Sequence, residues 1–330
     1  MPAMSSFGKV CITGGAGFIG SHLVTKLCDN NVDVVVLDNL SAGKIENVET
    51  LLKSPNFRFV HGDLLNFEEI QNSLSNCEVV FHLAANPEVR VGSENPEVHY
   101  EQNIAATFNL LEAVRKVGSV RVFVFSSSST VYGEPVEIPT PEDYAPLKPI
   151  SVYGASKMAS EALISGYAQT YGFNAIIYRL ANIVGPRSQH GVIFDFMNKL
   201  TEDSERLEIL GDGTQTKSYL DVEDTIDAML TGVSKSQGKV EIFNVGSEDK
   251  VNVKEIADIV CEEMSLSGVE YVYTGGIDGG RGWKGDVKVM LLNIERIKKL
   301  GWKPKLNSCQ AVRKAARALL NQSKKEASAD

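Results

Sequence analysis

The first 180 residues alternate short apolar runs with longer segments of helical periodicity. The apolar runs are rich in β-branched residues and nearly continuous, which predicts strands buried on both faces of a parallel sheet. The segments between them predict helices, and this alternation is typical of a doubly wound α/β fold. The predicted strands are 9–13, 32–38, 57–63, 78–83, 120–126 and 174–180, and the predicted helices are 17–29, 66–75, 97–117 and 152–171.

The pattern changes after residue 182. Loops rich in Gly, Pro and Ser, at 185–191, 211–218 and 274–286, separate shorter apolar segments. We therefore expect a sheet domain over 1–182 and a smaller mixed α/β lobe with a C-terminal helix over 183–330. The chain is expected to cross back from the second part to the first.

Composition narrows the class of protein. The 330 residues are 43% hydrophobic and 23% charged, with a net charge of -9, which argues against nucleic acid or an anionic membrane as a partner. The five cysteines form no CxxC pair, which predicts free thiols in a reducing compartment. No secretory signal or membrane-span pattern is present, so we expect a cytoplasmic protein. The five histidines have no metal-ligand spacing, so we predict no metal site and assign no histidine to catalysis.

A glycine-rich turn, Thr13 to Gly20, follows the first predicted strand and opens a helix. Glycines at 14, 17 and 20 let the backbone turn tightly and approach a pyrophosphate, which the helix N-terminus attracts. Three glycines alone are weak evidence, because a loop can use them only to turn. Their place between a strand and a helix favours a Rossmann dinucleotide site.

Asp38 ends the second predicted strand, 18 residues after Gly20. An acid there bonds the adenosine ribose and repels a 2′-phosphate, which predicts NAD and not NADP. A helix-capping role is the alternative. Asp63 and the alanines after the fourth strand are further candidates. The full set of predicted NAD ligands is Gly14, Gly17, Phe18, Ile19, Gly20, Asp38, Asn39, Asp63, Leu64, Leu83, Ala84, Ala85, Asn103, Tyr153 and Lys157.

Tyr153 and Lys157 are four residues apart on a predicted helix and therefore share one face. A tyrosine hydroxyl has a reference pKa near 10, so its use as a base at neutral pH requires about 4 kcal/mol of stabilisation of the phenolate. A nearby ammonium and the positive nicotinamide ring can supply this in a cleft. An exposed helix pair without function is the alternative.

Four serines, Ser126 to Ser129, follow the fifth strand at the edge where open α/β sheets bind ligands. A hydroxyl there can orient a substrate oxygen toward Tyr153. Spacing alone does not decide which serine acts, and all four can instead satisfy backbone groups.

The motifs TGGAGFIG, LDNLS, HLAA, FSSSSTVYG, YGASK and RLANIVGPR together resemble extended short-chain dehydrogenases. Among these they are most similar to the UDP-glucose 4-epimerase family, in particular to its shorter archaeal type. The resemblance runs from about residue 10 to the C-terminal helix. It implies an NAD-dependent enzyme that acts on a UDP-sugar, without net oxidation, and that forms a homodimer through helices near 94–117 and 152–171.

The resemblance also implies roles for individual residues. Ser128 becomes the catalytic hydroxyl, Tyr153 the acid and base, and Lys157 a ligand of the NAD ribose. Lys217 stands where relatives carry an Arg, and Arg281 lies farther from Asp286 than is usual. Met290 falls where relatives gate the C2 substituent of the sugar. The implied substrate residues are Ser128, Asn182, Val192, Lys217, Tyr219, Arg281 and Asp286, with Leu207 and Ile209 as contacts of the base or ordinary core residues.

The segment before Val131-Tyr132-Gly133 separates the reactions within this resemblance. The 4,6-dehydratases have an Asp-Glu pair there and the decarboxylases have Ser-Glu, whereas this chain has Ser129-Thr130. Reversible epimerisation at C4 of a UDP-hexose, through a 4-keto sugar, is therefore the expected reaction. A dehydratase, a decarboxylase, a reductase and a non-catalytic dinucleotide-binding protein are the alternatives.

Overall fold

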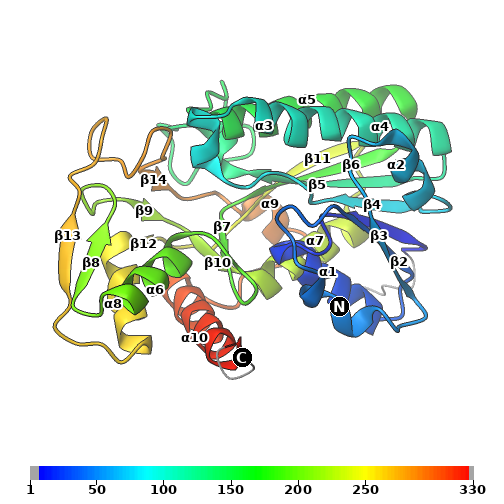
Figure 1. Cartoon of the computed structure of the whole chain (residues 1–330). Coiled ribbons are helices and arrows are strands. Elements are labelled where there is room, and N and C mark those ends of the chain that lie inside the picture. The colour runs from blue at the N-terminus through cyan, green and yellow to red at the C-terminus, as the bar shows by residue number, and fades with distance from the viewer. Residues whose placement is uncertain (1–6, 327–330) are drawn as a thin grey trace.

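The computed structural model describes residues 7–326 and is built around one parallel sheet of seven strands. The strand order is β11-β6-β5-β4-β1-β2-β3, and every neighbouring pair is parallel (Figure 1). This confirms the predicted doubly wound sheet and places β11, from the second half of the chain, at its edge. The strands are β1 (Val10–Thr13), β2 (Val34–Asp38), β3 (Phe57–His61), β4 (Val79–His82), β5 (Val122–Ser128), β6 (Asn174–Leu180) and β11 (Val240–Val245).

Helices cover both faces of this sheet, so alternate side chains of one strand enter two different cores. Val10 and Ile12 pack in one core, whereas Cys11 between them packs in the other. This is why the strands read as continuous apolar runs. In Figure 1 the α4–α5 pair lies on one face and α1 with α7 on the other. The helices are α1 (Phe18–Asp29) and α7 (Val222–Lys235) on one face, and α2 (Phe67–Ser73), α4 (Ala106–Val117) and α5 (Val152–Tyr171) on the opposite face.

The predicted helix 97–117 is interrupted by wide turns. It consists of α3 (Glu97–His99), the π-helical segment η5 (Tyr100–Ala105) and α4. Asn103 is buried within η5, where its side chain bonds to groups outside the helix. Single π-turns of this kind occur often at functional sites.

The smaller lobe is a mixed α/β unit with a core of its own, as predicted. Parts of the second half nevertheless pack with the large sheet, namely β11, α7 and α9, so the boundary at residue 182 stays a prediction. The remaining strands are β7 (Asn182–Val184), β8 (Arg206–Ile209), β9 (Thr216–Lys217), β10 (Tyr219–Asp221), β12 (Val251–Asn252), β13 (Glu270–Tyr273) and β14 (Val289–Met290). The remaining helices are α6 (Val192–Glu202), α8 (Val253–Glu263), α9 (Glu295–Lys298) and α10 (Ser308–Glu326), with short turns η2 (Ile45–Asn47), η3 (Glu49–Leu51), η4 (Val89–Ser93) and η6 (Ser129–Tyr132).

Three apolar residues of the lobe lie in cores. Leu207 and Ile209 are fully buried in the lobe core, which supports the second of their two predicted roles. Met290 packs in the core beside the large sheet and does not line the cavity described below, so the predicted gate is not supported. Between residues 7 and 326, no helix combines the length and apolar character needed to cross a bilayer.

Candidate active site

A cavity of about 500 Å³ extends from the carboxyl edge of the large sheet to the smaller lobe. Its lining comes from the turn after β1, the ends of β2, β4 and β5, the start of α5, and the lobe segments around β7, α6, β9 and residue 283. Ligands bind at this edge in open α/β sheets because the loops there diverge to opposite faces. The cavity therefore lies where the fold places a binding site.

The glycine turn after β1 forms one end of the cavity. Gly14 has φ of +72°, and a Cβ there would lie 2.6 Å from the Ala84 nitrogen. A Cβ on Gly20 would lie 2.1 Å from the Gly14 carbonyl oxygen. Helix α1 begins at Phe18 without a side-chain cap, so its first N–H groups are available to an anion. This cradle fits the pyrophosphate of a dinucleotide.

Asp38 joins this turn to the end of β2. Its Oδ2 accepts a hydrogen bond from the Ala16 N–H and its Oδ1 accepts one from the Leu40 N–H, both at 2.8 Å. Burial raises the pKa of the carboxyl, and the two hydrogen bonds oppose this shift. Each oxygen keeps a free lone pair for a ribose hydroxyl, because a carboxylate offers about four acceptor positions. Asp38 thus stabilises the glycine turn after β1 and fits the adenosine ribose of NAD.

The three predicted catalytic residues line the same cavity. Ser128 ends β5, and Tyr153 and Lys157 lie one turn apart at the start of α5, which Ser151 caps by accepting from the Gly154 N–H at 3.0 Å. The Lys157 Nζ donates to the Ser126 carbonyl at 2.9 Å and lies 5.9 Å from the centre of the Tyr153 ring. The sheet edge and one helix therefore bring together a hydroxyl, a phenol and an amine.

The protonation of Tyr153 and Lys157 differs from the simple expectation. Burial raises the pKa of Tyr153 to about 12, although a hydrogen bond with Ser128 lowers it. Burial lowers the pKa of Lys157 to about 7, although the charge of Glu161 raises it. Burial therefore disfavours the charged form of both side chains. An oxidised nicotinamide bound beside them would add a positive charge that favours the phenolate of Tyr153.

The lobe supplies the opposite wall of the cavity. Lys217 on β9 points its Nζ at the Asp286 Oδ1, 2.5 Å away, and Asn182 donates its Nδ2 to the Ser218 carbonyl at 3.3 Å. Asp286 is only 2% exposed, and its Oδ2 accepts a hydrogen bond from the Gly282 N–H at 3.1 Å. The predicted substrate residues that line the cavity are Ser128, Asn182, Val192, Lys217, Tyr219 and Asp286.

Comparison with known proteins agrees with this geometry. The model of the NAD dependent epimerase/dehydratase family matches residues 10–246. The chain belongs to this family. Both the predicted family and the predicted cofactor, NAD, are confirmed.

Relatives in the family resemble the chain over nearly its whole length. A putative UDP-glucose 4-epimerase of Methanocaldococcus jannaschii is 35% identical over 94% of this chain and 98% of its own. The crystal structure of a UDP-galactose 4-epimerase is 43% identical with a TM-score of 0.84, covering 95% and 99% of the two chains. A Thermotoga maritima UDP-glucose 4-epimerase with UDP-glucose is 34% identical with a TM-score of 0.85, covering 96% and 99%. The chain is therefore similar to whole epimerases and not only to their nucleotide-binding part.

Several of the predicted site residues lie outside the cavity lining. Asp63 accepts from the Asn39 Nδ2 at 2.9 Å and so positions a residue that does line it. Asn103 accepts from the Asn86 N–H and donates to the Ser156 Oγ, both at 2.9 Å, and Leu64 is buried in the sheet core. Arg281 binds Glu134 and backbone carbonyls. Direct contact of these four residues with a ligand stays a prediction.

The cavity also contains residues that the sequence did not indicate. Arg187 could have been found, because it ends the family motif RLANIVGPR, and it keeps one buried guanidinium nitrogen without a partner among the described residues. His190 lines the cavity although no histidine was assigned to it, and burial lowers its pKa. No local sequence pattern indicates that the remaining unpredicted residues line the cavity. Among the additional polar or aromatic lining residues are Ser41, Asn47, Arg90, Arg187, His190 and Trp283.

A buried ion pair supports the catalytic residues from behind. The Arg179 Nη2 lies 2.7 Å from the Glu161 Oε2, and both side chains are less than 8% exposed. The Ser127 Oγ donates to the Glu161 Oε1 at 2.5 Å, and Tyr132 accepts from the Arg179 Nη1 at 3.0 Å. The network joins β5, β6 and α5. It therefore fixes the strand end that carries Ser128 relative to the helix that carries Tyr153.

Proposed function

We propose that this enzyme catalyses reversible, NAD-dependent inversion at C4 of a UDP-hexose. The observation that carries the proposal is the presence of Ser128, Tyr153 and Lys157 on one cavity wall, with Thr130 beside them. The Thr130 Oγ1 donates to the Ser128 Oγ at 3.0 Å. A hydroxyl thus occupies a position at which the 4,6-dehydratases, by resemblance, have a carboxyl group.

Tyr153 moves the proton in this reaction. As a phenolate it takes the proton of the sugar 4-hydroxyl, and as a phenol it returns the proton after the ring has turned over. Ser128 holds the same oxygen by a hydrogen bond and keeps it near Tyr153. Bound NAD supplies the acceptor and later the donor of the C4 hydride. The sugar must therefore be held loosely and the nucleotide firmly.

The carboxylates of the cavity favour epimerisation over elimination. Within residues 7–326 four of them line it, and each already has a partner. Asp38 accepts two backbone N–H groups, and Asp286 binds Lys217. Glu88 binds Arg90 at 3.0 Å, and Asp195 lies 3.3 Å from the Lys199 Nζ. A free carboxyl group for dehydration chemistry is not among them.

The direct test is to incubate the purified enzyme with UDP-glucose or UDP-N-acetylglucosamine and to separate the products by chromatography. We expect conversion to the C4 epimer, with the same final ratio from either direction and no change in the absorbance of added NADH. A 4-keto-6-deoxy sugar would support a dehydratase instead. Net consumption of NADH would support a reductase.

We further propose a homodimer formed through α4 and α5. These helices pack side by side (Figure 1) and expose Phe108 and Tyr171, which are 45% and 49% exposed and whose rings both contact Tyr167. Clustered apolar side chains of this kind are typical of an interface. Sedimentation of the parent enzyme should give a dimer, and Phe108→Glu should shift it toward the monomer. A monomeric parent enzyme would contradict the proposal.

A further inference from the structure

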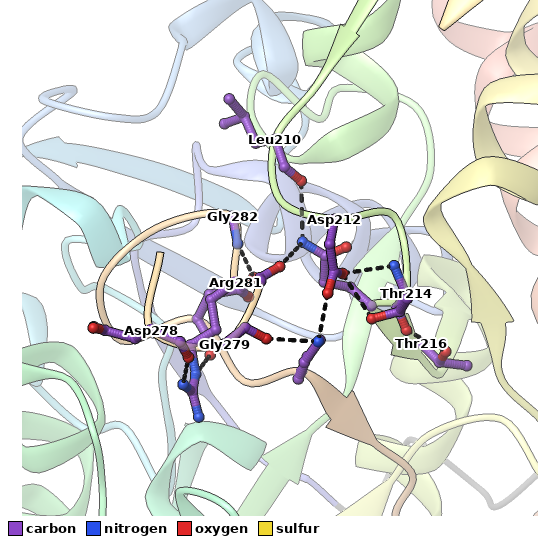
Figure 2. A network of polar contacts seen from close by, with 12 residues as sticks. Leu210, Asp212, Thr214, Thr216, Asp278, Gly279, Arg281 and Gly282 are labelled. Atoms are coloured by element: carbon purple, nitrogen blue, oxygen red, sulfur yellow. Dashed lines mark hydrogen bonds and ion pairs between the residues drawn. The ribbon is translucent and has the colours of Figure 1, made fainter. Parts of the chain in front are cut away.

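The segment from Ile277 to Asp286 is held on the lobe by polar contacts and not by an apolar core. Figure 2 shows the turn around Asp212 facing the turn at 278–282. The Asp212 N–H donates to the Gly280 carbonyl at 3.0 Å. Lys288 donates to both the Asp212 Oδ2 and the Gly279 carbonyl, at 2.7 Å each. These bonds fix the base of the segment.

Arg281 anchors the same segment to the catalytic half of the molecule. Its guanidinium binds the Asp278 carbonyl within the segment (Figure 2) and the Glu134 carboxylate, which lies just beyond η6. Its Nε donates to the Asp286 carbonyl at 3.0 Å. Because its nitrogens have these partners, Arg281 acts here as an anchor. The segment then presents Trp283 and Asp286 to the cavity.

Trp283 lies close to two cations that come from different segments of the cavity lining. The Lys217 Nζ, from the lobe, is 5.3 Å from the centre of the indole ring. The Arg90 guanidinium carbon, from η4 after β4, is 5.8 Å from the same ring. Both distances are within the range of attraction between a cation and an aromatic ring.

Each cation also has a carboxylate partner, Asp286 for Lys217 and Glu88 for Arg90. Lys has three N–H donors and Arg has five, so each cation can bind a ligand phosphate and keep its carboxylate, provided that the cation is held in place. An aromatic ring provides such support, because it attracts the cation without competing for its N–H groups. The indole N–H of Trp283 is itself buried and has no acceptor among the described residues.

We propose that Trp283 is a positioning residue for the diphosphate of the substrate, holding Lys217 and Arg90 in place so that each cation binds phosphate with its remaining N–H groups while it keeps its carboxylate partner. The inference rests on the proposed function, since it assumes a nucleoside diphosphate in this part of the cavity. It assigns to a tryptophan a role for which the sequence suggested Arg281.

The test measures binding of UDP to the NAD-loaded enzyme by calorimetry, together with KM and kcat for UDP-glucose. Trp283→Leu should weaken UDP binding about tenfold by loss of both ring contacts and should raise KM much more than it lowers kcat. Trp283→Phe keeps an aromatic ring and should cost about threefold. Phe67→Leu, which removes a ring on α2 whose centre lies 4.2 Å from the Lys116 Nζ and outside the cavity lining, is the matched control and should leave UDP binding unchanged.

A double-mutant cycle separates positioning from simple support of the loop. If Trp283 acts through Lys217, Trp283→Leu should cost less than about threefold in a Lys217→Met background. Fluorescence gives a second readout, because the chain has two tryptophans, 283 and 302. UDP should change the emission of the parent enzyme, and this change should be lost in Trp283→Phe.

Unchanged UDP binding in Trp283→Leu, or fully additive costs in the cycle, would overturn the proposal. These outcomes are distinct from failure of the proposed function. An enzyme that binds UDP through Trp283 but does not epimerise UDP-glucose would retain this inference and lose the reaction.

Discussion

The two walls of the cavity are built in different ways. The wall with Ser128, Tyr153 and Lys157 consists of strand ends and one long helix, joined behind by the buried Arg179–Glu161 pair. The opposite wall carries Trp283 and Asp286 on a segment without long strands or helices, tied by Asp212, Lys288 and Arg281. The first wall depends on apolar cores, whereas the 277–286 segment of the second depends on individual polar contacts. In the proposed reaction, the chemistry that needs fixed geometry lies on the first wall, and recognition that must allow the sugar to turn lies beside the second.

Removal of the phenol hydroxyl should break the chemistry of the first wall without affecting binding at the second. Tyr153→Phe is expected to lower kcat by about 10²–10⁴-fold, the usual contribution of a positioned acid–base group. NAD content and UDP binding should stay near the parent values. The measurement is kcat for UDP-glucose with cofactor content determined by absorbance. Tyr144→Phe, outside the cavity lining, is the control, and equal losses in both variants would contradict the assignment.

The buried Arg179–Glu161 pair links the structure of the first wall to the global stability of the protein. Arg179→Met leaves the buried Glu161 carboxylate without its cationic partner, so the free energy of unfolding should fall by about 3–5 kcal/mol. The double variant Arg179→Met/Glu161→Met should lose less, because no charge then remains unpaired. Urea denaturation measures both.

The exposed pair Lys254–Asp258, with both side chains more than 40% exposed, supplies the control for that comparison. Lys254→Met should change the free energy of unfolding by less than about 0.5 kcal/mol. A similar effect of Lys254→Met and Arg179→Met would mean that the buried network does not stabilise the sheet edge.

The first wall was predictable because its chemistry lies close to regular structure. Tyr153 and Lys157 are one helical turn apart, and Ser128 ends a strand whose apolar run identifies it. The glycine turn is readable because Gly14 and Gly20 have no room for a Cβ. In each case a local constraint on the chain also determines the position of the functional group.

The second wall was not predictable to the same degree. Arg281 binds Glu134, which lies 147 residues away in the sequence. Arg90 and Trp283 come from segments of the chain that share no local sequence pattern. Their placement depends on unusual backbone turns, such as the positive φ of Asp278 and Gly280. The family resemblance indicated Lys217 and Asp286, which both line the cavity, but it gave no signal for the tryptophan near the two cations.

The pH dependence of the free energy of unfolding tests whether Lys157 is buried in the first wall. Burial lowers its pKa to about 7, whereas an unfolded lysine has a pKa near 10.4. Between these values the unfolded chain binds more protons than the folded one, so this group makes folding more favourable as pH rises. The parent enzyme, stripped of NAD, should therefore gain stability relative to Lys157→Met by up to about 1.4 kcal/mol per pH unit between pH 7.5 and 9.5. A pH-independent difference between the two proteins would show that Lys157 is not buried as described.

The smallest expected effect gives the sharpest contrast between the two walls. Lys288→Met removes the ammonium group that binds both the Asp212 carboxylate and the Gly279 carbonyl. The side chains of Lys288 and Asp212 are each about 30% exposed. A pair of this exposure contributes about 0–1 kcal/mol to stability, so urea denaturation should change little. The loop that carries Trp283 would nevertheless loosen, and KM for UDP-glucose should rise about threefold, which corresponds to about 0.7 kcal/mol, while kcat stays near the parent value. Lys254→Met again serves as the control. If Lys288→Met instead lowered the free energy of unfolding as much as Arg179→Met, the substrate wall would be part of the same cooperative core as the sheet edge, and the distinction between the two walls would be wrong.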